Sequence, residues 1–454
     1  MTQLFALHSA YGLATAAAAI DAGLLGDSGP SGGVGERILV PFTSSRVPET
    51  TVGIAADPAL HSLRARFDRI ENLDDVVGPL HPSSWEPAEA DLLVLERLFI
   101  RAWDLDPHDL ELFVQSPQVA PARTLMSLFP QARIAIIGDG LMTYSPMRVR
   151  MPHTVAARIE RVVHADVVPG VRPLVGSPTA ELVPVPPERF AASLRETDAG
   201  EPTPEADAER STVLVLGQYL SALGLMSPAE EIALQGDMID RAARWSPERI
   251  VFKPHPAAPP LLTDAIRERA TTHGIEFVEY RGPLAAELLA ERLDAVAVVA
   301  GFSTALPTVH TLFGRAIGAA GTETVLRMLT PFENSNRIPA TIVDAITRER
   351  SPYTEPDRLQ LLIDAVGYAM QPEIAGHLRS RAEQLLAALD PAERDRYFSP
   401  RRLSELRLPD APREKIWERM LRPAGGVGRM EEWRLTAIGA RRRAGRAWRA
   451  IRGR

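Results

Sequence analysis

The chain has 454 residues, of which 45% are hydrophobic and 24% charged, with a net charge of −7 at pH 7 and no cysteine. This composition is typical of a soluble globular protein of two or three domains, and the lack of cysteine excludes disulfides, thiolate metal sites and thiol catalysis. No apolar run reaches the ~20 residues of a membrane span, and no basic segment precedes the first apolar residues as in a signal peptide. We therefore expect a cytoplasmic protein.

The first part of the chain alternates apolar runs with helical patterns. Residues 3–7 are an apolar run, followed by a loop and an alanine-rich stretch, which predicts strand, loop and helix. The glycine fingerprint of dinucleotide binding is missing there. Residues 110–114, 121–128 and 132–137 predict a β-α-β unit with parallel strands. Further strands are expected at 38–42, 161–168 and 181–185, and helices near 59–67 and 89–102.

The second strand of that unit ends at Gly138-Asp139-Gly140. Ligands of open parallel sheets bind beyond the carboxyl ends of the strands, and flanking glycines let the backbone turn and a substrate approach. Asp139 is therefore a candidate general base for an attacking hydroxyl. The alternative is a turn aspartate that bonds its own backbone. Thr143 and Tyr144 belong to a hydroxyl-rich stretch that is a candidate lining for an acceptor groove.

Residues 186–210 are rich in Pro, Glu, Asp and Ala without a periodic apolar pattern, which predicts an interdomain linker. A capping-box pattern at Ser227 and Glu230 predicts the start of a helix, and a second helix is expected near residues 284–292. Strands are expected at 212–216, 250–253, 275–280, 295–300 and 316–320.

The predicted fold class is α/β and GT-B-like, with two doubly wound Rossmann-like domains facing a central cleft. The domains are expected at residues 1–185 and 211–350, with C-terminal helices over 351–425 and a basic tail over 426–454. Sugar epimerases and periplasmic binding proteins share such a pattern, so the pattern alone does not define a function.

The strand at residues 250–253 runs into Lys253-Pro254-His255-Pro256. Each proline fixes its own φ and favours extended geometry in the residue before it, so Lys253 and His255 are expected in a stiff turn. Such a turn can aim an imidazole at a phosphate. A strand that merely ends at a proline turn has the same pattern.

Ser303 and Thr304 follow a later strand and precede a helix. Their hydroxyls, together with the backbone N–H groups at the start of that helix, form a candidate anion site. Simple capping of the helix is the alternative interpretation.

Three motifs, in order and in the expected halves, give the chain a resemblance to bacterial sialyltransferases. Gly138-Asp139-Gly140 resembles their (Asp/Glu)-(Asp/Glu)-Gly motif, Lys253-Pro254-His255-Pro256 their His-Pro motif, and Ser303-Thr304 their Ser/Thr pair. The chain is most similar to the α-2,8-polysialyltransferase family, over about residues 1–386. The further stretches that carry this similarity contain Gln115, Gly217-Gln218 and Asn336-Arg337.

The resemblance implies an inverting transfer of sialic acid from CMP-sialic acid to a glycan hydroxyl, with no metal and no other cofactor. CMP leaves with one phosphate, whose charge an imidazole and hydroxyls can meet without a divalent ion. Asp139 would be the general base and His255 would face the donor phosphate. Residues expected at the donor are Lys253, Pro256, Ser303, Thr304, Gly217 and Gln218. Residues expected on the acceptor side or its loops are Gly138, Gly140, Thr143, Tyr144, Gln115, Asn336 and Arg337.

The chain departs from the family pattern at Gly138, where the motif has its first acid. If that acid positions the base or the acceptor, the departure affects acceptor type or activity. Two alternatives stay open. One is a GT-B-like transferase of capsule or teichoic-type polymers with another activated donor, and the other is a non-catalytic glycan- or sugar-nucleotide-binding protein.

The end of the chain is strongly basic, because residues 434–454 hold eight arginines and no acidic residue. Trp433, Trp448 and intervening alanines recur there at helical spacing, which predicts a basic amphipathic helix on an anionic membrane surface. We expect a peripheral position at the cytoplasmic membrane face. A solvated tail or a nucleic-acid arm is the alternative, although nucleic acid is not the expected partner.

Overall fold

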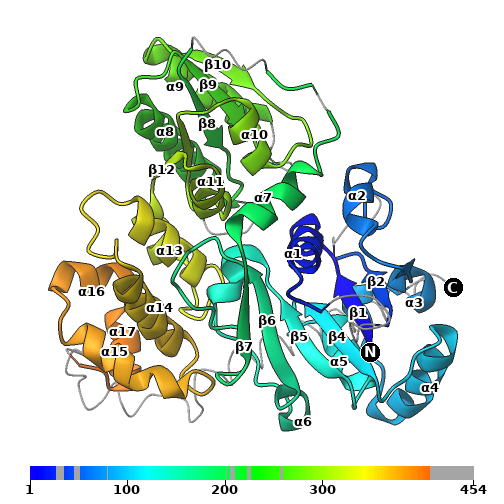
Figure 1. The fold of residues 1–454 in the computed structure, drawn as a ribbon. Helices are drawn as coiled ribbons and strands as arrows, with labels where there is room; N and C mark the ends of the chain where they lie inside the picture. Colours follow the sequence, from blue (N-terminus) through cyan, green and yellow to red (C-terminus); the bar gives the residue numbers. More distant parts are fainter. Residues whose placement is uncertain are drawn as a thin grey trace, which may run out of the picture.

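The computed structural model describes residues 1–26, 35–44, 52–78, 80–200, 202–204, 210–221, 226–255, 258 and 260–409. Within these residues the chain forms two parallel β-sheets covered by helices, and a group of C-terminal helices beside the first sheet (Figure 1). Pro256 and the predicted basic tail, residues 426–454, lie outside the described residues.

The first sheet, as far as the chain is described, has seven strands in the order β3-β2-β1-β4-β5-β6-β7, and all neighbours pair in parallel. The inner strands are buried on both faces, which explains why their sequences are mostly apolar. The order of the strands reverses between β1 and β4, so the carboxyl ends of these two strands border the usual ligand crevice. The strands are β1 (Thr2–Leu7), β2 (Arg37–Pro41), β3 (Arg69–Ile70), β4 (Leu110–Gln115), β5 (Arg133–Ile137), β6 (Ile159–Ala165) and β7 (Glu181–Val185).

Helices cover both faces of this sheet. Alternate residues of β1 point to opposite sides, Phe5 toward α1 (Ala10–Asp21) and Leu4 toward the cluster that contains α4 (Leu92–Ala102) and α5 (Ala122–Leu128). The alanines of α1 let it pack closely, and it is buried over most of its length. Shorter helices of this half are η2 (Pro58–Leu60), α2 (His61–Arg64), α3 (Leu73–Val77), η3 (Pro82–Ser84), η4 (Glu89–Asp91), η5 (Gly140–Tyr144) and α6 (His153–Ala156).

The second sheet has five described strands, again all parallel, in the order β10-β9-β8-β11-β12. The order reverses between β8 and β11, so this half has a ligand crevice of its own. The capping box predicted at Ser227 and Glu230 is confirmed at the start of α8. The elements are β8 (Thr212–Leu216), α8 (Pro228–Ala243), β9 (Arg249–Lys253), α9 (Pro260–Thr272), β10 (Glu276–Glu279), α10 (Ala286–Arg292), β11 (Ala297–Ala300), α11 (Ala305–Phe313), β12 (Ala316–Ala319), α12 (Thr322–Met328) and α13 (Arg337–Thr347).

The two sheets confirm the predicted GT-B-like fold class. One predicted segment needs correction, because residues 187–195 of the expected linker form the helix α7 (Pro187–Arg195). Phe190 and Leu194 of α7 are buried, and the Phe190 ring lies 4.9 Å from that of Tyr11. The helix therefore packs against α1 as part of the fold. The apolar positions of α7 span only about one helical period and stand next to prolines, so the composition of this segment alone indicated a linker.

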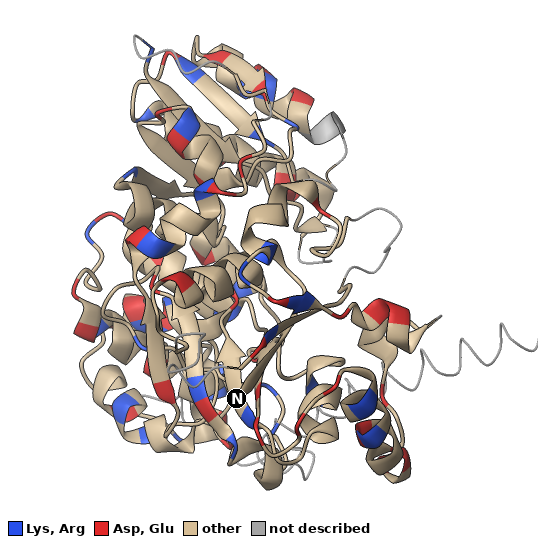
Figure 2. Ribbon diagram, turned by 45° about the vertical axis from the view of Figure 1, so that its right-hand side comes forward, with Lys and Arg blue, Asp and Glu red and all other residues tan. Residues whose placement is uncertain are grey.

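The C-terminal helices pack against the β7 side of the first sheet (Figure 1). Gln360 exchanges hydrogen bonds with the backbone of Arg172, which ties α14 to the loop before β7. Charges of both signs are interspersed over the face shown in Figure 2. No described helix is long and apolar enough to cross a membrane. The helices are α14 (Pro356–Met370), η7 (Gly376–Leu378), α15 (Arg379–Leu386), α16 (Pro391–Tyr397) and α17 (Pro400–Leu406).

Candidate active site

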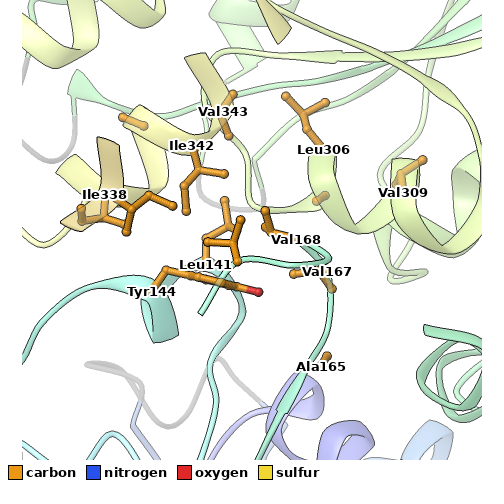
Figure 3. Packing of buried hydrophobic residues seen from close by; sticks show 14 of the residues in the cluster. Leu141, Tyr144, Ala165, Val167, Val168, Leu306, Val309, Ile338, Ile342 and Val343 are labelled. Atoms are coloured by element: carbon orange, nitrogen blue, oxygen red, sulfur yellow. The ribbon is translucent and has the colours of Figure 1, made fainter. Parts of the chain in front are cut away.

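Asp139 stands between the end of β5 and the start of η5. Its backbone N–H donates a hydrogen bond to Thr143 Oγ1 at 2.7 Å, which closes a tight turn. Gly140 has a φ of +52°, a left-handed conformation that favours glycine. Leu141 and Tyr144 are fully buried and pack with side chains of α11 and α13 (Figure 3). The turn that carries Asp139 is thus anchored in a core shared by both halves of the chain.

This packing corrects the prediction for Tyr144. Because its ring is buried between η5 and the second half, Tyr144 does not line an acceptor groove as predicted. Thr143 is also buried, but it lines the small cavity next to Asp139.

Gln115, the last residue of β4, orients the Asp139 carboxylate. Its Nε2 donates to Asp139 Oδ1 at 3.2 Å and to Ser9 Oγ at 2.7 Å, while its Oε1 accepts from the backbone N–H groups of His8 and Ser9. The side chain has no exposed surface. A Cβ at Gly12 would come within 2.5 Å of Gln115 Oε1, so glycine is needed there for close approach. With every polar atom bonded, the amide holds one orientation.

Gly138 leaves no room for the acid of the family motif. A Cβ at this position would lie 2.8 Å from Thr143 Oγ1 and 2.9 Å from His164 Cβ, closer than real side chains approach. His164 is itself buried, and burial lowers its pKa to about 4, so its imidazole is neutral. Gly138 is therefore fixed by packing against Thr143 and His164.

A cavity of about 130 Å³ opens beside Asp139. The hydroxyl of Ser145 donates to the Ser335 carbonyl at 3.3 Å, which joins the end of η5 to the loop before α13. The polar residues that line the cavity include Asp139, Thr143, Ser145, Ser116, Arg148 and Ser335. A larger cavity of about 920 Å³ adjoins it, since both are lined by Pro146 and Val175, and extends to α14.

The loop before α13 was predicted to contribute Asn336 and Arg337, and the structure places these differently. Asn336 is the cap residue just before α13, with its backbone N–H donating to Asn334 Oδ1 at 3.0 Å. Arg337 is buried, and its guanidinium donates to the carbonyls of Leu326, Leu329 and Phe332. Burial lowers the pKa of Arg337 to about 10. Arg337 stabilises the loop, and Ser335, which was not predicted, lines the cavity.

The second half brings Lys253 and His255 to the carboxyl end of β9. Lys253 Nζ donates to the Gly282 carbonyl at 2.7 Å and lies 4.9 Å from the centre of the Tyr280 ring. Burial lowers the pKa of Lys253, and the nearby Glu287 carboxylate opposes this shift. His255 is exposed, with the Tyr219 ring 6.3 Å away. Desolvation by neighbouring parts of the chain lowers the pKa of His255, and the charge of Glu231 opposes this shift.

Close backbone packing brings the other predicted donor residues to the same edge. A Cβ at Gly217 would lie 2.8 Å from Phe252 Cζ and 3.0 Å from Pro254 Cα, so only glycine fits between β8 and the proline turn. The Gln218 side chain lies over Gly301, the residue after β11. Two residues further on, Ser303 Oγ accepts from the N–H of Ala305 at 3.2 Å, and Thr304 is the exposed cap residue of α11.

The two sets of residues meet across the halves. A Cβ at Gly140 would lie 3.8 Å from Tyr11 Cζ and 4.0 Å from Thr304 Cβ. The turn that carries Asp139 thus lies beside Thr304, the cap of α11. Among the described residues no group of three or more His, Asp or Glu side chains is arranged to hold a metal ion.

Sequence reasoning did not select two titratable groups at this junction. Burial raises the pKa of Tyr11 well above its usual value, and the charges of Glu287 and Asp139 act in the same direction. Burial also raises the pKa of Glu287, while Lys253 opposes the shift. Tyr11 follows a strand end in the sequence, which was a usable signal. Glu287 lies in an ordinary helical stretch and gave none.

Two doubly wound parallel sheets, with the Asp139 turn of the first half beside the Thr304 cap of the second, define a GT-B-like fold. The family comparison agrees. The chain belongs to the alpha-2,8-polysialyltransferase (POLYST) family, whose model matches residues 3–316. The predicted family is thereby confirmed. No curated protein sequence matches the chain.

Solved structures with a similar arrangement include sugar-nucleotide epimerases and a glycosyltransferase. A putative UDP-N-acetylglucosamine 2-epimerase from Listeria monocytogenes is 11% identical with a TM-score of 0.37, over 82% of this chain and 97% of that one. The UDP-GlcNAc 2-epimerase from Neisseria meningitidis is 9% identical with a TM-score of 0.42, over 83% and 94%. A glycosyltransferase from Rickettsia africae is 10% identical with a TM-score of 0.35, over 85% and 96%.

Proposed function

We propose that this chain moves sialic acid from CMP-sialic acid to a glycan hydroxyl by an inverting, metal-independent mechanism. Membership of the polysialyltransferase family supports the donor and the transferred sugar. The structural observation that supports the proposal is the proximity of the Gly140 turn to Thr304, where a Cβ at Gly140 would lie 4.0 Å from Thr304 Cβ, because it brings the Asp139 turn near the candidate phosphate-binding hydroxyls.

In this mechanism Asp139 accepts the proton of the acceptor hydroxyl as the oxygen attacks the anomeric carbon of sialic acid. A new C–O bond forms on one face of the sugar while the bond to the CMP phosphate breaks on the other, which inverts the anomeric configuration. CMP leaves with an additional negative charge on its phosphate. The hydroxyls of Ser303 and Thr304, the first N–H groups of α11 and the imidazole of His255 stabilise that charge.

Lys253, Gly217 and Gln218 would hold the nucleotide part of the donor. Lys253 is already bonded to the Gly282 carbonyl, which fixes the direction of its side chain. Gly217 keeps the backbone of β8 tight against Pro254, and Gln218 borders the turn that leads to Ser303. The cation and the amide would therefore approach the donor from the side of β8 and β9.

The decisive experiment incubates the purified protein with CMP-sialic acid and measures CMP release with and without a sialylated or galactosyl acceptor. We expect slow hydrolysis alone and faster CMP release with the acceptor. Asp139→Ala and His255→Ala should each lower acceptor-dependent release by roughly a hundredfold or more, as for a catalytic base and a leaving-group stabiliser. Nuclear magnetic resonance of the product should show the opposite anomeric configuration from that of the donor.

Other results would support the alternatives. Turnover of a different nucleotide-sugar without CMP release would indicate a capsule or teichoic-type polymer transferase. Donor binding that survives Asp139→Asn, with no turnover by either form of the protein, would indicate a non-catalytic binding protein.

A further inference from the structure

Ser116 lies at the carboxyl end of β4, directly after Gln115, and lines the same cavity as Asp139. Its φ is +57°, a left-handed conformation that non-glycine residues seldom adopt. Such a conformation persists only where the surroundings hold it, and residues of this kind cluster at ligand sites. The strand end therefore presents the Ser116 hydroxyl at the cavity wall at some conformational cost.

His8, the first residue after β1, holds the Ser116 hydroxyl in place. Its Nε2 lies 2.9 Å from Ser116 Oγ and its Nδ1 lies 3.1 Å from Ser44 Oγ, so both ring nitrogens have partners. The backbone N–H of the same residue donates to Gln115 Oε1 at 3.1 Å. Burial of the ring lowers the pKa of His8, while the Asp139 carboxylate opposes this shift. The ring is accordingly neutral near pH 7.

A neutral imidazole has one N–H donor and one acceptor nitrogen, which sets the polarity of its neighbours. When Nδ1 accepts a hydrogen bond from the Ser44 hydroxyl, the proton of the ring is on Nε2, which donates a hydrogen bond to Ser116 Oγ. The Ser116 O–H then remains free to donate into the cavity. An ionised Asp139 carboxylate offers only acceptors there, so Ser116 and Asp139 together present a donor and an acceptor to the cavity. Two neighbouring oxygen groups of a sugar ring match that pair.

We propose that Ser116, oriented by His8, binds the acceptor glycan through an oxygen group next to the hydroxyl that Asp139 deprotonates. This inference rests on the proposed role of Asp139 as general base. Ser116 is the group that touches the substrate, and His8 is a positioning residue that acts through it. The acceptor class is a glycan that carries an oxygen substituent beside the reacting hydroxyl.

The test measures acceptor and donor KM, and kcat, for full-length Ser116→Gly, Ser116→Ala and His8→Gln. Glycine suits the left-handed φ, so Ser116→Gly removes the hydroxyl without straining the backbone. Loss of one hydrogen bond should raise the acceptor KM roughly five- to tenfold and leave the donor KM unchanged. Ser83→Ala is the matched control, because Ser83 Oγ also bonds a histidine, His81, but at the surface and outside the site.

A set of mono-deoxy acceptors distinguishes binding from a structural effect. With the wild type, removal of the neighbouring oxygen should raise the acceptor KM by about the same factor as Ser116→Gly does. With Ser116→Gly or His8→Gln, the same removal should cause no further rise of the acceptor KM. Fully additive losses would overturn the inference. An unchanged acceptor KM in both Ser116 variants, with transfer abolished in Asp139→Ala, would also overturn it while the proposed function stands. Full transfer by Asp139→Ala would instead overturn the proposed function, and this inference with it.

Discussion

Gly138 and its two neighbours determine how much room the chain leaves beside Asp139. Since a Cβ there would lie under 3.0 Å from both Thr143 and His164, Gly138→Ala should displace the hydroxyl that closes the Asp139 turn. Overpacking of this kind typically costs about 1–3 kcal/mol of stability, and we expect transfer to fall with it. Thermal unfolding and kcat check both effects.

The matched control for Gly138→Ala is Gly236→Ala. Gly236 lies inside α8, and a Cβ there meets no heavy atom within 4 Å. Alanine should therefore stabilise the helix by about 0.5–1 kcal/mol and leave transfer unchanged. A Gly138→Ala protein as stable and active as the wild type would contradict the packing explanation. The family's acid would then be tolerated at this position.

Gln115 permits a second test at the residue scale. Gln115→Glu keeps the shape of the side chain but removes both N–H donors and sets a carboxyl group against Asp139 Oδ1 and Ser9 Oγ. A buried partner left unpaired costs about 1–3 kcal/mol, so kcat should fall by roughly ten- to a hundredfold. Steady-state kinetics measure this change, and a circular dichroism spectrum equal to that of the wild type shows that folding is intact. A wild-type kcat would show that the amide does not orient Asp139.

At the scale of elements, β6 gives the fold a pH dependence through His164. The pKa of His164 is about 4 in the folded chain, below its usual value of 6.5, because burial disfavours the charged ring. Between these values the unfolded chain binds more protons, so stability rises with pH. The free energy of unfolding is therefore unaffected by protonation of His164 above pH 6.5. As the pH falls toward 4, the proton uptake of the unfolded chain lowers this free energy by about 3 kcal/mol in total.

The measurement for His164 is urea unfolding of the wild type and of His164→Leu at a series of pH values. The difference between the two free energies of unfolding should change between pH 6.5 and 4 and stay constant above pH 7. A difference that is constant over the whole range would mean that the ring takes up its proton in the folded chain as readily as in the unfolded one.

The strands were predictable because central parallel strands are buried on both faces and therefore form nearly continuous apolar runs, as in β8 and β11. Two elements that the sequence did not predict, a strand and a helix, are both short. β3 consists of Arg69–Ile70 alone, and α7 has too few apolar positions to show a period beside its prolines. Elements whose formation depends on what they pack against leave little trace in a single sequence.

Candidate site residues can be selected from the sequence where one short segment carries the motif, as at Asp139 and Ser303, whose roles stay predictions. The site was not predictable where the partner lies more than a hundred residues away, as for His8 and Ser116, which meet only because β1 and β4 are adjacent. For the same reason the burial of Tyr144 and Arg337 was missed, since a motif gives the order of residues but not the direction of a side chain.

At the scale of the whole molecule, α17 supports the loop that closes the Asp139 cavity. Arg402 Nη2 lies 3.0 Å from Glu333 Oε1, and both side chains are at most 3% exposed. The guanidinium also donates to the carbonyls of Ala369 and Met370. Because Ser335 follows Glu333 by two residues, this buried pair connects the C-terminal helices with the cavity wall.

Arg402→Met should therefore be costly, since it removes the guanidinium that pairs with the buried Glu333 carboxylate. Breaking a buried pair typically costs about 3–5 kcal/mol. The acceptor KM should rise as well, because the Ser335 loop loses its support. Urea unfolding and kinetics test this, and Arg402→Met combined with Glu333→Gln should regain part of the stability. A double variant less stable than Arg402→Met would contradict this explanation.

The arginine-rich residues 434–454 lie outside both the described structure and the part of the chain that matches the family. We propose that they contact the anionic face of a membrane, where each basic residue near the surface contributes about 1 kcal/mol. The wild type should sediment with phosphatidylserine-containing vesicles at low salt and be released at high salt, because the attraction is screened. Deletion of the residues after Gly428 should leave the protein in the supernatant.

Two controls make the sedimentation experiment decisive. Neutral phosphatidylcholine vesicles should bind neither form, since the tail offers charge and only a mostly alanine apolar stripe. Transfer to a soluble acceptor should be equal in both forms, because the truncation spares the whole family-matched region. Equal sedimentation of the two forms on anionic vesicles would exclude the tail as the membrane contact. Loss of vesicle binding when DNA is added would show that the charge of the tail, not a lipid, selects the partner.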